Sequence, residues 1–223
     1  MSHVTVEARP KTDGVPSRRG TLGRSLLALV EIVVSPREAL GAIRRTSAWV
    51  PLLSIASLRF AWLFIEFSPS LAPAKLLLSL LLQVMISGVQ YLIVSLAVGA
   101  VLLIRGGRLR FTGLVRAVLL VGFLLEFVRF VLAVSGRAFG AGLTTPSEQY
   151  FTNLGWAIPA IENLPLHHAL SIVDILVLYC AYRLMQGLEG VVEEMSGPKL
   201  ATSLAICWLA YASITTAIKM YVS

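Results

Sequence analysis

Apolar residues run almost without interruption through several long segments after residue 48, and short polar segments separate them. About twenty consecutive apolar residues are enough to cross the hydrocarbon core of a bilayer as a helix. Five segments reach that length. The pattern therefore predicts an all-α fold, a polytopic membrane helix bundle with five transmembrane helices at about 49–67, 76–104, 114–134, 169–187 and 199–218.

The segment before the first predicted span is polar at its start and amphipathic afterwards. Residues 1–20 are polar and basic, without the apolar core of a secretory signal, and we expect them to be disordered. Residues 21–48 are predicted to form amphipathic helices at the membrane surface. One helix start is explicit in "SPRE", where Ser35 is the predicted N-cap, Pro36 the first helical residue and Glu38 the reciprocal cap.

The composition supports a membrane location, and the distribution of positive charge predicts the orientation of the chain in the membrane. Of the 223 residues, 57% are hydrophobic and 14% are charged, whereas a soluble domain averages about 25% charged residues. Eight of the nineteen Lys and Arg residues precede Trp49. The positive-inside rule then predicts a cytoplasmic N-terminus, an external connection over 135–168 and an external C-terminus. We expect anionic lipid headgroups to contact Arg37, Arg44, Arg45, Arg105, Arg108 and Arg110.

Charged residues inside the predicted spans are the main candidates for function, because a charge in hydrocarbon is costly unless it is paired. Glu126 and Arg129 lie one helical turn apart, on a stripe of the third span that also holds Gly122 and Ala133. Small residues allow helices to approach closely, so we expect this stripe to face the bundle. The predicted network inside the bundle comprises Arg59, Glu66, Glu126, Arg129 and Asp174, and a polar stripe on the second span comprises Gln83, Ser87 and Gln90.

Two interpretations of this intramembrane network are open at the level of sequence. In the first, the charges fix the register of the helices and satisfy one another. In the second, they line a polar path for a proton, an ion or a small solute. The chain has neither an inverted repeat nor a pair of broken helices of the kind found in transporters, which favours the first interpretation.

No catalytic motif stands out, and we predict no enzymatic activity. The sequence lacks GxxxxGK, HExxH, GxSxG and CxxC patterns. Cys180 and Cys207 each lie in an apolar run and are interpreted as packing residues. His167 and His168 open the fourth predicted span, where a neutral imidazole suits axial ligation of a haem or chlorophyll-type pigment. Otherwise no cofactor or metal is predicted, and the basic residues lack the interleaved aromatics of a nucleic-acid site.

Three stretches together resemble the Ypt-interacting-protein (Yip) domain family of multi-spanning membrane proteins. The stretch "SPREALGAIRRTSAWVPLL" (35–53) is similar to the family's proline-started interfacial helix and first span. The stretch "GGRLRFTGLVRAVLLVGF" (106–123) is similar to its glycine-rich loop and third span. In "LSIVDILVLYCAYRLMQGLEGV" (170–191), Asp174 occupies the place of an acidic residue in the family. The short, arginine-rich chain resembles the prokaryotic branch, which implies an inner (cytoplasmic) membrane location.

The resemblance implies a role in molecular contacts rather than in catalysis. The leading hypothesis is a membrane scaffold or organising protein of the Yip type, which binds other integral membrane proteins and lipids. A second hypothesis is an accessory subunit docked on a larger respiratory or photosynthetic complex, where it packs lipid or pigment. A third is a small-solute or ion permease that uses the buried charges.

Overall fold

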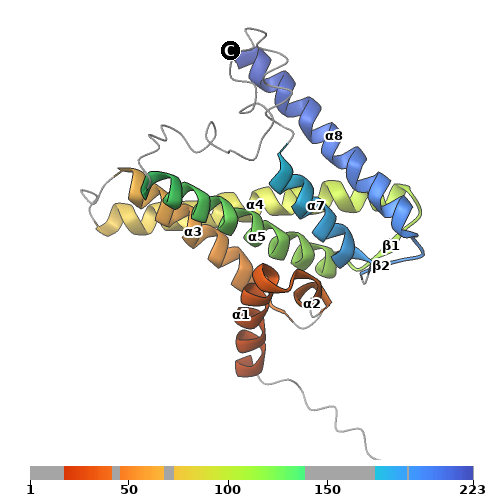
Figure 1. The fold of residues 1–223 in the computed structure, drawn as a ribbon, viewed down its shortest axis with the longest axis horizontal. Coiled ribbons are helices and arrows are strands. Elements are labelled where there is room, and N and C mark those ends of the chain that lie inside the picture. The colour runs from red at the N-terminus through yellow and green to blue at the C-terminus, as the bar shows by residue number, and fades with distance from the viewer. Residues whose placement is uncertain (1–17, 42–45, 68–72, 139–173, 190, 223) are drawn as a thin grey trace, which may run out of the picture.

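The computed structural model of the protein describes residues 18–41, 46–67, 73–138, 174–189 and 191–222. Over these ranges the chain is mostly helical, which confirms the all-α prediction (Figure 1). One short antiparallel sheet pairs β1 (Arg108–Leu109) with β2 (Val192–Glu193). The helices that the structure describes are α1 (Arg18–Val34), α2 (Pro36–Gly41), α3 (Trp49–Phe67), α4 (Pro73–Ile104), α5 (Phe111–Ala138), α7 (Ile175–Leu188) and α8 (Gly197–Val222).

Two of the described helices are long and apolar enough to cross a membrane. They are Lys75–Ile104 within α4 and Phe111–Gly136 within α5, which match the second and third predicted spans. Helices α3 and α7 are apolar but shorter. With 14 residues, α7 is about 21 Å long at 1.5 Å per residue, whereas the hydrocarbon core of a bilayer is about 30 Å thick. The arrangement with five crossings therefore stays a prediction.

The rest of the described chain covers the two long helices to different extents. The most apolar window is only 33% buried in Lys75–Ile104 and 44% buried in Phe111–Gly136. The large side chains exposed along α4 are leucine, isoleucine, valine and methionine. The exposed apolar side chains of α4 form an extended surface of the kind that a protein or lipid commonly covers.

Helix α5 forms the centre of the bundle. Every residue from Ala117 to Leu124 is buried, so α5 is covered on all sides over two turns. It contacts α3, α4 and α7, and α1 also reaches it. A helix that is apolar and buried all round is a core helix. Helices α3, α4 and α7 are therefore arranged around α5, whereas α8 packs on α4 and α7 (Figure 1).

The close approach of α4 to α5 depends on Gly122. A Cβ atom at this position would clash with one edge of the Tyr91 side chain, against Cε1, 2.6 Å from Cζ and 2.9 Å from the hydroxyl oxygen. Tyr91 is buried on α4 and has little room to move away. Gly122 belongs to the stripe of small residues predicted to face the bundle, and small residues of this kind bring helix backbones together.

The N-terminal helices pack on the bundle with one side and leave the other side exposed. Helix α2 starts at Pro36, as the "SPRE" motif predicts, and the Ser35 carbonyl accepts a hydrogen bond from the Glu38 N–H at 3.0 Å. A hydrogen bond connects the segment before α3 to α1: the Ser47 N–H donates to the hydroxyl oxygen of the buried Ser25 at 2.8 Å. The opposite side of α1 exposes apolar residues, as expected of an amphipathic helix: Leu22, Leu26, Leu27, Val30, Val33 and Val34.

The short sheet was not predicted, and it holds two connections at the same end of the bundle. Strand β1 follows α4 and strand β2 follows α7, with Arg108 opposite Glu193. Helix α2 reaches the same end, where Leu40 packs against Gly187 near the end of α7. Strands of two residues carry too little alternation of apolar and polar positions to be recognised in a sequence.

Replacing Gly122 with alanine should destabilise the bundle, because the added methyl group must displace Tyr91. Overpacking of a core costs about 1–3 kcal/mol. Thermal unfolding of the purified protein in detergent, followed by circular dichroism, measures the loss. Gly23→Ala in α1 is the control, since a Cβ atom there has nothing within 4 Å. Combining Gly122→Ala with Tyr91→Leu should recover part of the stability, and equal melting temperatures for the two glycine variants would contradict the close packing.

Candidate functional site

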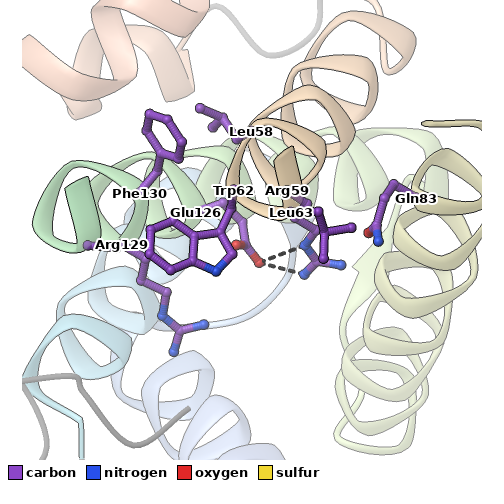
Figure 2. A pocket seen from close by; sticks show the side chains of 9 residues that line it. Leu58, Arg59, Trp62, Leu63, Gln83, Glu126, Arg129 and Phe130 are labelled. Atoms are coloured by element: carbon purple, nitrogen blue, oxygen red, sulfur yellow. Dashed lines mark hydrogen bonds and ion pairs between the residues drawn. The ribbon is translucent and has the colours of Figure 1, made fainter. Parts of the chain in front are cut away.

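A cavity of about 320 Å³ lies between α3, α4 and α5 (Figure 2). Its wall combines two guanidinium groups, one carboxylate and one amide with apolar side chains. The structure thus brings together three residues of the predicted network. The lining residues are Leu58, Arg59, Trp62 and Leu63 from α3, Gln83 from α4, and Glu126, Arg129, Phe130 and Ala133 from α5.

The shortest polar contact at the cavity is the ion pair between Arg59 on α3 and Glu126 on α5. The carboxylate oxygen Oε1 of Glu126 accepts hydrogen bonds from Arg59 Nη2 at 2.5 Å and from Arg59 Nε at 3.2 Å. The Arg59 and Glu126 side chains are only 18% and 15% exposed. Charge-assisted bonds from a guanidinium to a carboxylate are stronger than bonds between neutral groups. This pair therefore ties α3 to α5.

Helix α4 completes the group around Arg59. The Arg59 Nη1 donates to Ser87 Oγ at 3.2 Å and to Gln90 Oε1 at 2.9 Å. The Tyr91 hydroxyl donates to Glu126 Oε1 at 3.5 Å, and the Arg59 guanidinium lies over the Tyr91 ring, 5.8 Å from its centroid. A buried ion pair is stable only when further hydrogen bonds satisfy its members. The polar stripe of α4 supplies these bonds.

A second ion pair connects α5 to α7. The Arg129 Nη2 lies 3.4 Å from Asp174 Oδ2, and the Asp174 side chain is only 6% exposed. The other oxygen, Oδ1, accepts hydrogen bonds from the Leu176 N–H at 2.8 Å and the Val177 N–H at 3.4 Å. The prediction that Asp174 lies within a helical span was wrong. Its backbone is extended and it is the N-cap of α7, a position that aspartate favours because its carboxylate satisfies N–H groups of the first turn.

Glu126 and Arg129 therefore pair with different helices rather than with each other. Glu126 pairs with α3 and Arg129 with α7, although the two residues lie one turn apart on α5. The four charges form two neutral pairs, which is the arrangement that burial requires. The fifth residue of the predicted network, Glu66, belongs to α3, but its side chain lies outside the described residues.

The remaining predicted site residues fall into two groups. Arg105, Arg108 and Arg110 are exposed where α4 ends and β1 begins, and Arg108 pairs with Glu194 at 3.1 Å. The exposed position of these three arginines leaves them accessible to lipid headgroups. The residues whose side chains lie outside the described part of the chain are Arg37, Arg44, Arg45, His167 and His168.

Two aromatic residues at the site were missed by the sequence analysis. Trp62 lies three residues after Arg59, and this spacing places both on one side of α3. Tyr91 lies four residues after Ser87 and thus continues the polar stripe of α4. The helical spacing was a usable signal for both. Aromatic residues are frequent in apolar helices, however, so spacing alone does not distinguish them from packing residues.

The cysteines and the acidic residues show no sign of a metal centre in the described ranges. Cys180 is buried, Cys207 is partly buried, and both are free thiols. No group of three His, Cys, Asp or Glu side chains among the described residues is placed to hold a metal ion.

Comparison with known proteins does not identify the chain. No protein-family model, no curated protein and no solved structure matches it. The function must therefore be inferred from the residues and contacts of the chain itself.

Breaking the Arg59–Glu126 pair from one side should be costly, because the remaining carboxylate stays buried without its partner. We expect Arg59→Gln to lower the free energy of unfolding by about 3–5 kcal/mol. The control Arg108→Gln breaks the exposed pair with Glu194 and should cost about 0–1 kcal/mol.

Unfolding in mixed detergent micelles, followed by tryptophan fluorescence, compares these variants. The double variant Arg59→Met with Glu126→Leu should be more stable than Arg59→Gln, because it leaves no buried charge unpaired. Equal losses for Arg59→Gln and Arg108→Gln would show that the Arg59–Glu126 pair is not buried.

Proposed function

We propose that this chain is a non-enzymatic integral membrane protein that organises other membrane proteins and lipids through helix contacts. In this proposal it is a prokaryotic-type member of the Yip family and crosses the membrane five times, with α3, α4, α5, α7 and α8 as its spans. The length and apolar composition of α4 and α5, and the low coverage of α4, support the membrane location. The proposal rests on one observation above all, which concerns the last helix.

Only the first turns of α8 pack against other described parts of the chain, and the helix continues beyond them. Its first turns pack on α4 and α7, where Leu200, Ser203 and Leu204 are buried. Figure 1 shows that α8 then continues past the start of α7. Over these later turns its large apolar side chains are exposed: Ile206, Leu209, Tyr211 and Ile214. In a bilayer, such a face packs against lipid or against a helix of another protein, and a scaffold requires such a face.

The three stretches that resemble the Yip family lie against one another, which supports treating them as one motif. Leu40 from the first stretch packs against Gly187 from the third. Gly113 from the second stretch lies against Val191 at the end of the third. Residues that are far apart in the sequence thus meet at one end of the bundle. Such contacts are expected if the three stretches form a single family motif.

The ion pairs support a structural use of the buried charges. Arg59 and Glu126 are engaged with each other and with α4, and Asp174 is engaged with Arg129 and with the start of α7. Ion pairs of this kind determine which helices are neighbours. They also determine how far each helix is shifted along its axis relative to its neighbour. The contacts therefore favour the first of the two interpretations of the network.

The basic end of the bundle supports contacts with lipid and a cytoplasmic side. Arg105, Arg108 and Arg110 are exposed at the same end as α2 and the short sheet. Anionic headgroups on the cytoplasmic leaflet attract basic segments next to a span. We therefore assign this end to the cytoplasm of a prokaryotic cell, and the opposite end to the external side.

A photo-reactive amino acid at Leu209, on the exposed face of α8, should form adducts with another membrane protein in native membranes. The control position is the buried Leu200, where only links within the chain are expected. Adding Ile206→Ala and Ile214→Ala should lower the yield of the adduct without changing the melting temperature, because both side chains are exposed.

Adducts are identified by mass spectrometry after solubilisation. Adducts with lipid alone would contradict a scaffold. Adducts confined to one haem- or chlorophyll-containing complex would replace the scaffold with the accessory-subunit hypothesis.

The orientation has a separate test. Alkaline phosphatase fused to the C-terminus should be active, and green fluorescent protein fused there should be dark, because an odd number of crossings places the C-terminus outside. Green fluorescent protein fused to the N-terminus should fluoresce. A fluorescent C-terminal fusion would require an even number of crossings and would overturn the five-span arrangement.

A further inference from the structure

Arg183 on α7 is a cation that no carboxylate neutralises among the described residues. It forms no ion pair in this part of the chain, whereas Arg59 and Arg129 each have a carboxylate partner. Its side chain is partly buried rather than free in solvent. Arg183 therefore keeps an uncompensated positive charge at a defined place on the surface of the bundle.

Two tyrosines and a glutamine of the same helix hold the Arg183 guanidinium in place. The guanidinium lies over the Tyr179 ring, 4.9 Å from its centroid, and over the Tyr182 ring, 5.8 Å from its centroid. Nη1 donates to Gln186 Oε1 at 2.8 Å, and Gln186 Nε2 donates to the Tyr182 hydroxyl oxygen at 2.9 Å. Stacking of this kind suits the planar arginine side chain. The guanidinium is thus oriented before any ligand binds, which lowers the entropic cost of binding.

The two remaining nitrogens of Arg183 differ in accessibility. Nε is enclosed by the protein and has no hydrogen-bond partner, so it is not available to a ligand. Nη2 also makes no hydrogen bond within the described residues, but it is not among the enclosed nitrogens. It carries two N–H groups and no acceptor. An anionic oxygen is the partner that this accessible, charged donor suits best.

The exposed side of α7 changes from apolar to polar toward Arg183. Ile175 and Leu178 are exposed aliphatic residues near the start of the helix, and the exposed Tyr179 and Tyr182 follow them. Ile175, Tyr179 and Tyr182 share one side, because they are four and three residues apart. From Ile175 to Arg183 the helix rises about 12 Å, which is close to half of the roughly 30 Å hydrocarbon core. A phospholipid has the same order of acyl chain, glycerol and phosphate across one leaflet.

Arg183 also lies toward the basic end of the bundle. Helix α7 ends five residues later, near β2 (Figure 1). The exposed arginines at positions 105, 108 and 110 lie at the same end. In the proposed orientation this end meets the headgroups of the cytoplasmic leaflet, where anionic lipids gather around basic groups.

From these observations we propose that α7 carries a binding site for the phosphate of one anionic phospholipid. The Arg183 Nη2 donates to a phosphate oxygen, Tyr179, Tyr182 and Gln186 position the guanidinium, and the acyl chains lie along Ile175 and Leu178. The site rests on the proposed membrane location. It gives the lipid contacts of that proposal one position and one chemistry.

Native mass spectrometry of the purified full chain in detergent tests the site, because each bound lipid adds its own mass. Phosphatidylglycerol and phosphatidylcholine with identical acyl chains are the two probes. The first phosphatidylglycerol should bind the wild type more tightly than the first phosphatidylcholine. Arg183→Gln should weaken the binding of phosphatidylglycerol by roughly tenfold, since a hydrogen bond to a charged group is lost.

The matched control is Arg105→Gln, which removes an equal charge from an exposed side chain at the same end. Its affinity for phosphatidylglycerol should stay within about threefold of the wild type, because exposed charges that nothing orients contribute little. Equal losses for Arg183→Gln and Arg105→Gln would overturn the proposal, and so would wild-type affinity in Arg183→Gln.

Two further variants separate a built site from simple attraction of charges. Arg183→Lys keeps the charge but loses the planar group, and it should bind phosphatidylglycerol as weakly as Arg183→Gln. Tyr179→Leu keeps Arg183 and removes the nearer ring, which should also weaken binding. Wild-type affinity in both variants would show that α7 holds no oriented site and would overturn the proposal.

Two measurements on the wild type keep the proposal testable if the variants do not fold. Glycerol phosphate has the phosphate without the acyl chains, and an excess of it should leave phosphatidylglycerol bound; displacement would assign the site to a soluble phosphate instead. Carbonate extraction of native membranes tests the proposed membrane location separately. Release of the chain would contradict that location and the lipid site together, whereas retention without a preference for phosphatidylglycerol would contradict the lipid site alone.

Discussion

A guanidinium and a carboxylate that meet away from water set the main constraint on this bundle. Arg59 and Glu126 come from different helices, and neither tolerates burial without the other. Their contact fixes the height of α3 relative to α5, and the bonds from Arg59 to Ser87 and Gln90 extend the same constraint to α4. Apolar packing alone would determine the relative position of the helices less specifically, because one leucine-rich surface can pack against another in several positions.

The cavity follows from this constraint. Helices α3, α4 and α5 are held around a group of large polar side chains, which do not fill space as completely as leucine and phenylalanine do. At the level of Gly122 the backbones of α4 and α5 approach closely around Tyr91. One turn further along α5, the charged side chains take the place of the close contact, and the space beside them stays open. The same residues therefore stabilise the bundle and line a polar cavity between its helices.

Much of the fold was predictable because apolar periodicity and helix starts are local properties. The limits of the first predicted span match α3, and Pro36 begins α2 as "SPRE" indicates. The identity of interacting partners was less predictable. Spacing places Glu126 and Arg129 on one side of α5, but it does not say which helix lies opposite each of them. The pairing with α3 and α7 is a property of the three-dimensional arrangement. The N-cap role of Asp174 was missed because the apolar run continues on both sides of it.

The double use of Asp174 links the start of α7 to α5 through a single side chain. The N–H groups of Leu176 and Val177 hold one oxygen, and the other oxygen lies next to Arg129. A change at residue 174 would therefore act on the start of α7 and on the junction between α7 and α5 at the same time.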